Sequence, residues 1–372
     1  MNITIVQGGL LPIPPVLGGA MEKIWYDLGK QFVIMGHNVT HISTKYKNLP
    51  DHEVISGVTH KRIKKYFSIK SLFFIIFSDF FYALRAVRAV PNNSDIIISN
   101  TYWFPIFAFF LKKIICIQVD RTPGIQFKLY KKANRFSVPS TATEISLKKI
   151  LKSNYHSKIK MIPHHVPFYL KEKNEINSKD QTILYCGRIH QKKGIENIIK
   201  AINFLDIQNW KVNIIGPCDL KHGGSGENYY QYLKNSILKE NINLLPPIFD
   251  KKELINCYRK ASIFLYPSED NGESAPVAPL EAMAMGCVPI VSDLICFKDY
   301  IKHNENGLIF NQKNNNAHLE LAEMIAKLIN NNKFRMALAN KALEVKSTHS
   351  LSVISSLYIK DFKLLLNQSP KK

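Results

Sequence analysis

The sequence lacks several features that define common classes of protein. Its 372 residues include only six cysteines, with no Cys-x-x-Cys pair and no cluster of cysteine with histidine. This pattern is typical of reduced, mostly buried thiols in a cytosolic protein. No Asp-x-Asp motif occurs, so the sequence implies no bridging divalent ion. The chain opens on the strand-like residues 2–6, whereas a signal peptide needs a basic start and a longer apolar run.

Acidic residues are also few, and their distribution is uneven. The chain has 29 acidic against 50 basic residues, and the net charge of +21 divides into +15 on residues 1–170 and +6 on the remainder. Such a field favours an anionic partner: nucleic acid, anionic lipid or a phosphorylated substrate. The many Lys, Asn and Ile residues are also typical of AT-rich coding sequences, so part of the excess has a compositional explanation. No helix-turn-helix signature, zinc spacing or RRM-type aromatic motif accompanies the charge, which disfavours a nucleic-acid-binding protein.

The length and the hydrophobic pattern predict two α/β domains. A chain of 372 residues exceeds one typical core. Short apolar runs, typical of buried parallel strands, alternate with helical spacing in two series. The predicted strands are residues 3–6, 39–43, 95–99 and 114–119, then 182–187, 211–216, 243–245, 263–266 and 288–292. The predicted helices include residues 19–35, 195–204, 229–239 and 251–260, and residues 171–180 are the best linker. This alternation predicts doubly wound sheets.

One stretch near the C-terminal third is the most informative about function. Glu273 lies in a loop after the predicted strand 263–266, and Glu281 lies eight residues further on, in a helix that Gly286 can end. Pro276 suits the first turn of that helix, where its missing N–H costs nothing. Helix N-termini in such strand–loop–helix units bind phosphates through their outward N–H groups. Two carboxylates beside such a site favour a ligand that carries hydroxyl groups as well as a diphosphate.

This spacing resembles the Glu-x7-Glu signature of family 4 of the retaining, nucleotide-sugar-dependent glycosyltransferases. Three further segments are similar to motifs of that family, in the family's order. They are Gly-Arg-x4-Lys-Gly at residues 187–194, Gly-Gly-x-x-Glu at residues 18–22 and Gly-His-x-Val-Thr at residues 36–40. The resemblance spans most of the chain, from residue 3 to about residue 342.

The resemblance implies the GT-B fold, in which two Rossmann-like domains face each other across a cleft. Residues 1–170 would form the acceptor-binding domain and residues 181–351 the nucleotide-sugar-binding domain. The last helix, within about 352–372, would cross back onto the N-terminal domain, because the family's last helix does so.

For the donor diphosphate, the resemblance implies a basic loop and a glycine turn. Arg188 and Lys193 match the positions that bind the diphosphate and stabilise it as it leaves, and both are cations at neutral pH. Gly18 and Gly19 would let backbone N–H groups approach the distal phosphate, since glycine has no Cβ. The alternatives are a solvated basic loop and an ordinary turn.

For the rest of the donor, the resemblance assigns different roles to the two carboxylates. Glu281 would accept hydrogen bonds from the ribose hydroxyls, and Glu273 would lie near the donor sugar. Ser274 and Ala275, beside Glu273, would also contact the donor. The family's usual Glu-Gly-Phe-Gly is here Glu273-Ser274-Ala275-Pro276, and the missing glycines leave the donor sugar open. The alternative is that both carboxylates only compensate the helix dipole.

One family feature is missing from the N-terminal half. The strand 114–119 leads into Asp120, where the family often has a histidine close to the donor sugar. Asp120 could take over a polar role there. His164 and His165 occupy positions where the family usually has Asn-Gly, and we interpret them as turn residues.

The leading hypothesis is a retaining glycosyltransferase of the hexosyltransferase type, which moves a sugar from a nucleotide-diphosphate sugar to an acceptor hydroxyl. It would need no cofactor and no metal, and the acceptor would be a saccharide or lipid-linked compound of cell-envelope polysaccharide or glycolipid synthesis. The alternatives are another GT-B sugar-nucleotide enzyme, an epimerase or a phosphorylase, and, with less support, a basic nucleic-acid-binding protein.

A basic and aromatic segment, residues 61–88, bears on localisation. It brackets the apolar run 72–82 with lysines and arginines, which is typical of segments that lie in a membrane interface. The run is too short, and too interrupted by Asp79, to span a bilayer. The sequence leaves open an ordinary buried helix or attachment to the cytoplasmic face of an anionic membrane.

Overall fold

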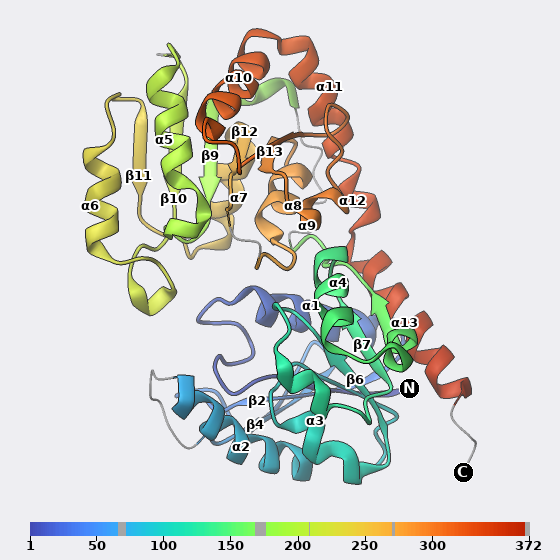
Figure 1. Cartoon of the computed structure of the whole chain (residues 1–372). Helices are drawn as coiled ribbons and strands as arrows, with labels where there is room; N and C mark the ends of the chain where they lie inside the picture. Colours follow the sequence, from blue (N-terminus) through green and yellow to red (C-terminus); the bar gives the residue numbers. More distant parts are fainter. Residues whose placement is uncertain (66–71, 168–175, 208, 270–271, 369–372) are drawn as a thin grey trace. The chain divides into compact units, whose positions relative to one another are not determined.

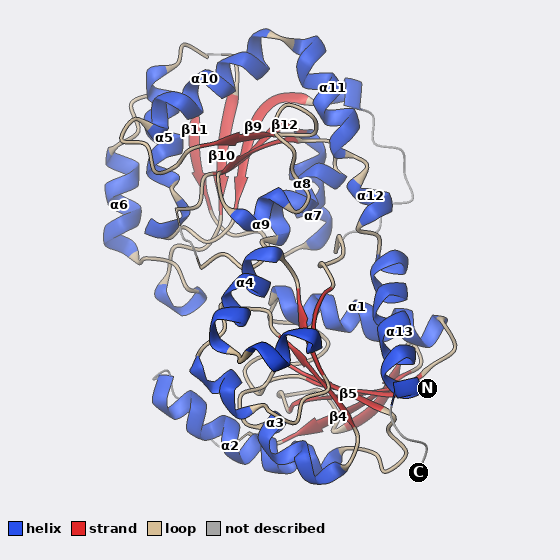
Figure 2. Cartoon of the chain, turned by 45° about the vertical axis from the view of Figure 1, so that its right-hand side comes forward, coloured by secondary structure: helices blue, strands red, loops and turns tan. Residues whose placement is uncertain are grey.

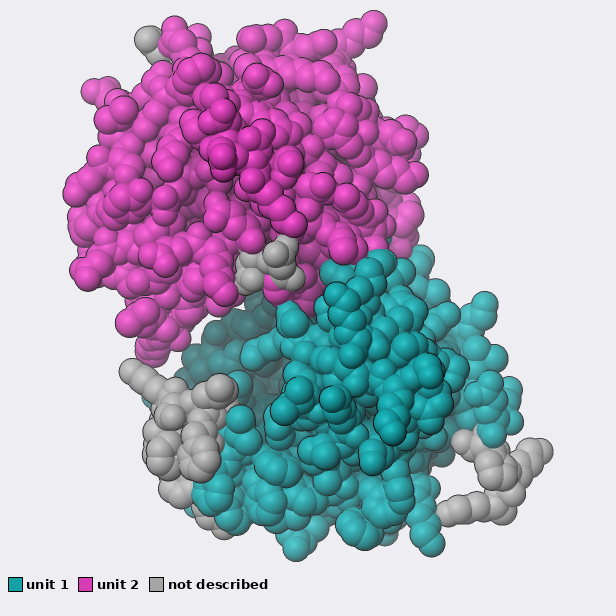
Figure 3. Space-filling model, in the orientation of Figure 1, with its two compact units in different colours: residues 1–167, 349–372 teal, residues 168–348 magenta. Residues whose placement is uncertain are grey.

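The structure is a computed structural model, in which residues 1–65, 72–167, 176–207, 209–269 and 272–368 are described (Figure 1). The chain divides into two compact units (Figure 3). Unit 1 comprises Met1–Pro167 and His349–Lys372, and unit 2 comprises Phe168–Thr348. The C-terminal segment therefore belongs to the same unit as the N-terminus.

Unit 1 is built on an eight-stranded sheet in the order β3-β4-β2-β1-β5-β6-β7-β8. Its strands are β1 Asn2–Val6, β2 Asn38–Thr44, β3 His52–Ile55, β4 Val58–Ile63, β5 Ile96–Ser99, β6 Ile114–Gln118, β7 Arg135–Val138 and β8 Ile159–Met161. All neighbours are parallel except β3 and β4, which form an antiparallel edge. The direction of winding reverses between β1 and β5, where ligands of doubly wound sheets bind.

Helices cover this sheet (Figure 2). They are α1 Ala20–Ile34, α2 Leu72–Ala89, α3 Phe104–Phe107, α4 Thr141–Ile150 and α13 Leu351–Gln368, with 3-10 turns η1 Ala108–Leu111, η2 Ile125–Leu129 and η3 Ser153–Lys158. The C-terminal helix α13 packs on α1, where the rings of Trp25 and Tyr358 lie 5.4 Å apart. Asp361 of α13 is buried and pairs with Arg135 at 2.8 Å. These contacts fix α13 to unit 1, as the resemblance implied.

Unit 2 contains a six-stranded, fully parallel sheet in the order β11-β10-β9-β12-β13-β14. Its strands are β9 Asp180–Cys186, β10 Lys211–Ile215, β11 Ile242–Leu245, β12 Ala261–Tyr266, β13 Val288–Ser292 and β14 Leu308–Phe310. The central strands β12 and β13 are buried along their whole length, which explains their continuous apolar sequences. The winding reverses between β9 and β12.

The helices of unit 2 complete the second doubly wound domain. They are α5 Ile195–Phe204, α6 Glu227–Asn235, α7 Lys251–Lys260, α8 Val277–Ala284, α9 Ile295–Lys298, α10 Ala317–Asn330, α11 Asn332–Ala342 and α12 Val345–Thr348, with 3-10 turns η4 Ile176–Ser178, η5 Gln191–Lys193 and η6 Leu220–His222. Among these, α5 packs against α10. The predicted α/β class with two Rossmann-like domains is confirmed.

Across the described part of the chain, we find no helix whose length and apolar character would let it cross a bilayer.

Candidate active site

Two loops of unit 2 meet at the carboxyl ends of the neighbouring strands β9 and β12. The first, residues 187–194, connects β9 to α5, and the second, residues 267–276, connects β12 to α8. The backbone N–H of Glu269 donates to the Lys192 carbonyl at 2.9 Å, and Oγ of Ser268 lies 3.2 Å from the same carbonyl oxygen. The two predicted motifs are therefore bonded to each other at the point where the sheet reverses its winding.

Gly194 makes this close approach possible. Its φ is +66°, a conformation that L side chains rarely adopt, and a Cβ at this position would lie 1.9 Å from the Pro267 carbonyl oxygen. The final glycine of the Gly-Arg-x4-Lys-Gly motif is thus required by the junction of the two loops.

Lys193 and Glu273 form a buried ion pair across this junction. The Lys193 Nζ contacts Glu273 Oε1, and the two side chains are only 9% and 12% exposed. Glu273 also accepts hydrogen bonds from the Ser268 hydroxyl at 2.7 Å and from the Tyr266 hydroxyl at 3.4 Å. Lys193 donates to Tyr266 as well, at 3.3 Å. The sequence suggested separate roles for these two charges, whereas the structure places them in contact.

Lys193 is buried although it lies in a loop. Because its ammonium group is enclosed against a carboxylate, its removal would leave an uncompensated charge, which is costly. Burial, and secondarily the charge of Glu273, raises the pKa of Tyr266 well above its usual value, so this hydroxyl stays protonated.

Arg188, in contrast, is exposed at the start of the first loop. Its guanidinium donates one hydrogen bond, from Nη1 to the Gly223 carbonyl at 3.3 Å, and its own carbonyl accepts from the Tyr185 hydroxyl at 2.9 Å. Gly223 has a φ of +80°, and a Cβ there would lie 2.7 Å from Nη1 of Arg188. This bond to Gly223 uses one of the five N–H groups of a guanidinium, which suits Arg188 to bind an anionic ligand as well.

Glu281 lies on α8 in a separate network. Its Oε2 accepts a hydrogen bond of 2.9 Å from the hydroxyl of Tyr258, a fully buried residue of α7. Burial, and then the nearby Cys186 and Glu281, raises the pKa of Tyr258 well above its usual value, so its hydroxyl remains a donor. Glu273 and Glu281 are thus held by different partners. The sequence carried no signal for Tyr258.

The start of α8 differs slightly from the prediction. Pro276 is the residue that caps the helix, one position before the first turn, and Gly286 follows the helix end with a φ of +77° as predicted. Ser274 and Ala275 precede this cap and are partly exposed. Asp270 and Asn271, in the same loop, lie outside the described residues.

In unit 1, the predicted glycine turn lies at the N-terminus of α1. Gly18 and Gly19 have φ values of +79° and +94°, and Gly19 caps the helix. A Cβ on Gly19 would lie 2.1 Å from Oε2 of Glu22. Burial raises the pKa of Glu22. Both glycines therefore adopt conformations that other residues rarely take.

Asp120 follows β6 at the carboxyl edge of the same sheet. Its carboxylate accepts from Gln118 Nε2 at 2.8 Å and from Asn100 Nδ2 at 3.5 Å. Gln118 in turn accepts from the Tyr358 hydroxyl of α13 at 3.0 Å. Burial raises the pKa of Asp120 to about 6, against the lowering effect of the Gln118 and Asn100 hydrogen bonds. We did not predict the contacts of Asn100 and Gln118 with Asp120 from the sequence. Asn100 could have been predicted, because it follows a buried strand, as Asp120 does.

The predicted segment 61–88 divides between core and surface. Arg62 does not belong to an exposed basic cluster: it is 3% exposed and donates to the carbonyls of Ile13 and Pro50 at 2.8 and 2.6 Å. Tyr82 is fully buried, whereas Phe77 is 46% exposed. Residues 66–71, and the side chains of residues 72–75, lie outside the described residues.

The two adjacent histidines, His164 and His165, are buried, and His165 Nδ1 lies 3.0 Å from the Val166 carbonyl. Over the described ranges, no group of three or more His, Cys, Asp or Glu residues could hold a metal ion.

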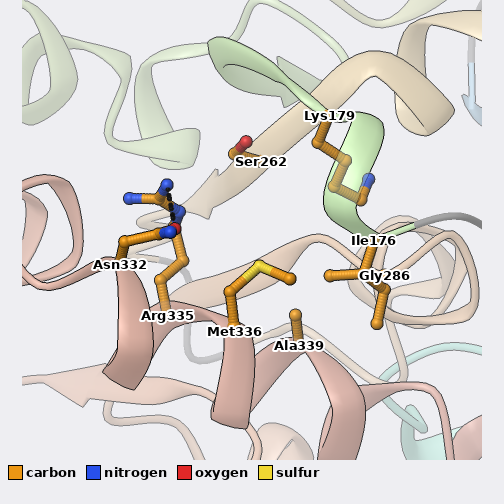
Figure 4. A pocket seen from close by; sticks show the side chains of 8 residues that line it. All are labelled: Ile176, Lys179, Ser262, Gly286, Asn332, Arg335, Met336 and Ala339. Carbon is orange, nitrogen blue, oxygen red and sulfur yellow. Dashed lines mark hydrogen bonds between the residues drawn. The ribbon is translucent and has the colours of Figure 1, made fainter.

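A cavity of about 260 Å³ lies at the other edge of the unit 2 sheet, beside the starts of β9 and β12 (Figure 4). Its two cations already hold backbone carbonyls: Lys179 donates to the Ala261 carbonyl at 2.6 Å, and Arg335 donates to the Leu328 carbonyl at 2.6 Å. None of the predicted site residues lines this cavity. The candidate site is therefore the loop junction at the carboxyl edge.

Two doubly wound domains are the architecture of the GT-B fold. Residues 169–345 match the family model described as "Glycosyl transferases group 1". The chain is 24% identical over 335 residues to an "uncharacterized glycosyltransferase" of Methanocaldococcus jannaschii, covering 81% of this chain and 83% of that protein. It is 22% identical over 242 residues to a 41.2 kDa protein "in cps region" of Klebsiella pneumoniae, covering 63% and 59% of the two chains.

Among solved structures, the HepE protein of Anabaena in complex with UDP and glucose superposes with a TM-score of 0.74 at 13% identity, covering 98% of this chain and 99% of that one. The chain thus has the fold of the GT-B glycosyltransferases, and its residues 169–345 are similar to the group 1 glycosyltransferases. These matches do not favour the epimerase, phosphorylase or nucleic-acid-binding alternatives.

Proposed function

We propose that this glycosyltransferase uses a nucleoside-diphosphate sugar and transfers the sugar with retention of its anomeric configuration. The observation that carries the proposal is the buried Lys193–Glu273 pair at the loop junction, with the exposed Arg188 at the start of the same loop. The likeness to a structure that holds UDP and glucose supports a donor of this kind.

The diphosphate would lie against Arg188 and Lys193. An ammonium group has three N–H donors, and Lys193 uses two of them on Glu273 and Tyr266. The third N–H can bind a phosphate oxygen. Arg188 adds a planar fork for the second phosphate. Preorganised donors of this kind stabilise the charge that develops on a leaving diphosphate. No metal ion is required in this scheme.

The sugar would lie beside Glu273 and the ribose beside Glu281. Glu273 is already fixed by Lys193 and two hydroxyl groups, so its charge can support positive charge on the anomeric carbon without reorganisation. Glu281, whose carboxylate accepts from Tyr258, would also accept hydrogen bonds from the ribose hydroxyls. Within unit 1, Gly18 and Gly19 would offer backbone N–H groups to a phosphate, and Asp120 would accept a hydrogen bond from a sugar hydroxyl.

In the chemical step, the bond between the anomeric carbon and the diphosphate oxygen breaks. The acceptor oxygen attacks the same face of the sugar, and the acceptor proton passes to the departing diphosphate oxygen. Retention then needs no protein nucleophile. Glu273 acts through its charge, and Arg188 and Lys193 hold the leaving group.

We infer that the acceptor is a hydroxyl of a cell-envelope saccharide or a lipid-linked glycan, and that the enzyme works at the cytoplasmic face of the membrane. The basic charge of residues 1–170 and the similarity to a protein "in cps region" of Klebsiella pneumoniae support this inference.

The test is a transfer assay with a panel of UDP-, GDP-, ADP- and dTDP-sugars and extracted envelope glycolipids. Nucleoside diphosphate release identifies the donor, and proton NMR of the product gives its anomeric configuration. The proposal expects one donor class to react and the product to keep the donor's configuration. An inverted product would refute the retaining mechanism, and the absence of transfer from every donor would refute the donor class.

A further inference from the structure

Three neighbouring strands of unit 1 are entered through basic residues. Lys112 and Lys113 precede β6, Lys131 and Lys132 precede β7, and Lys158 precedes β8. Because β6, β7 and β8 are parallel and adjacent, these residues gather at one edge of the sheet, its amino-terminal edge. The candidate site residue Asp120 lies at the opposite, carboxyl edge.

Two exposed phenylalanines lie in the same loops. Phe109 and Phe110 of η1 are 39% and 78% exposed, and their ring centroids are 5.1 Å apart. The Lys132 Nζ lies 3.0 Å from the centroid of the Phe109 ring, which joins the loop before β7 to the loop before β6. We call the exposed residues of these two loops the amino-edge surface: Phe109, Phe110, Lys112, Lys131 and Lys132.

Little negative charge opposes these lysines. Asp120 is the only acidic residue in the sequence between Asp95 and Glu144, and it lies at the other edge of the sheet. Asp95 does lie near the amino-terminal edge, but it accepts hydrogen bonds from the backbone N–H and side chain of Asn2, at 2.8 and 3.4 Å. The amino-edge surface is therefore both apolar and strongly cationic.

We propose that the amino-edge surface binds an anionic lipid membrane, with Phe110 in the headgroup region and the lysines beside the lipid phosphates. Exposed aromatic rings next to lysines are typical of surfaces that lie in a membrane interface. Stacking of nucleic-acid bases fits less well, because the ammonium of Lys132 covers one face of Phe109.

The proposal rests on the proposed function in one respect, the envelope acceptor, and it adds a geometric consequence. The five residues of β6 separate the two edges of the sheet by roughly 16 Å, at about 3.3 Å per residue. A membrane at the amino-edge surface would lie that far from Asp120. The sugar that accepts the transfer must therefore be carried away from the lipid on a glycan chain.

The test is co-sedimentation of the full chain with vesicles of phosphatidylcholine alone and with vesicles that also contain phosphatidylglycerol. Phe110→Ser and the double variant Lys131→Gln/Lys132→Gln alter the amino-edge surface. Phe204→Ser is the matched control, because Phe204 is a 69% exposed phenylalanine of unit 2.

For the charge change, Lys64→Gln/Lys65→Gln is the matched control on the segment 61–88.

We expect the wild type to pellet with the anionic vesicles only, and less at high salt, since the screening length falls from about 10 Å at 0.1 M to about 3 Å at 1 M. Phe110→Ser should weaken vesicle binding several-fold. The double variant at positions 131 and 132 should weaken it roughly tenfold or more. The two controls should bind like the wild type.

Equal binding by Phe110→Ser and wild type would overturn the proposal, and so would loss of binding in the Lys64→Gln/Lys65→Gln control alone. Pelleting in the absence of vesicles would also overturn the proposal, in favour of self-association. Tight binding to RNA without binding to anionic vesicles would overturn it in favour of nucleic-acid binding. Donor transfer to a water-soluble acceptor, measured on the same variants, separates the two ideas. Transfer that persists while vesicle binding is lost leaves the proposed function intact.

Discussion

Replacing Lys193 by methionine should destabilise unit 2 as well as abolish transfer. The substitution keeps most of the side-chain volume and removes the cation, so Glu273 is left as a 12% exposed charge without its partner. Breaking a buried ion pair from one side costs about 3–5 kcal/mol. Because Glu273 keeps the hydroxyl groups of Ser268 and Tyr266, we expect the lower end of this range, about 3 kcal/mol.

The assay is urea unfolding followed by fluorescence, with donor transfer measured on the same preparations. Lys192→Met is the matched control, because Lys192 is an exposed lysine on the same loop, and it should change the free energy of unfolding by less than about 0.5 kcal/mol. The double variant Lys193→Met/Glu273→Gln removes both charges. It should recover stability to within about 1 kcal/mol of the wild type while transfer stays abolished.

This pattern separates the structural cost of the pair from its chemical role. If Lys193→Met is no less stable than Lys192→Met, the ion pair is not a buried one. If the double variant is less stable than either single variant, the two side chains do not compensate each other, and the reasoning fails.

Four further predictions concern the site. Glu281→Gln should chiefly weaken nucleotide affinity in calorimetry and Glu273→Gln should chiefly lower the rate at saturating donor, and the reverse pattern would contradict the assigned roles. Gly194→Ala should cost about 2–4 kcal/mol in denaturant unfolding, because of its positive φ and the adjacent carbonyl, whereas Gly8→Ala, with nothing within 4 Å of a Cβ, should be nearly neutral. EDTA should leave transfer largely intact, and complete loss that magnesium reverses would refute a metal-independent mechanism. Burial raises the pKa of Asp120 to about 6, so the protonated carboxyl stabilises the fold fully below about pH 4, and this stabilisation is lost as the pH rises through 6. Between pH 4 and 7, the free energy of unfolding of the wild type should therefore fall by up to about 3 kcal/mol relative to that of Asp120→Asn.

Much of the fold could be predicted because the buried parallel strands are continuous apolar runs. The predicted helices 195–204 and 251–260 and the strand 288–292 match α5, α7 and β13 residue for residue. The strands β3, β4, β7, β8 and β14 were missed: β3 and β4 carry mixed polar sequences at the sheet edge, and the other three have only three or four residues. Such strands are defined by their neighbours, and their own pattern is too weak.

The candidate site could be predicted only as separate motifs. The motif spacing indicated Arg188, Lys193 and Glu273 as candidates, but it could not show that Lys193 and Glu273 form a pair, since they are 80 residues apart. Nor could it identify Tyr258, which reaches Glu281 from a different helix. Contacts of this kind depend on which strands become neighbours in the sheet. In this chain, the contact between β9 and β12 creates the site.

The most direct test of the account is calorimetric titration of nucleoside diphosphates and their sugar conjugates into the wild type, Arg188→Ala and Lys192→Ala. Arg188 is exposed, so its replacement should leave folding unchanged while it removes one arm of the diphosphate site. The account predicts that one nucleoside diphosphate binds the wild type and the Lys192→Ala control equally, and binds Arg188→Ala at least tenfold more weakly, as expected for loss of a charge-assisted contact of about 1.5–3 kcal/mol. Equal affinity of Arg188→Ala and wild type for every nucleotide would contradict a diphosphate site at the junction of the two loops.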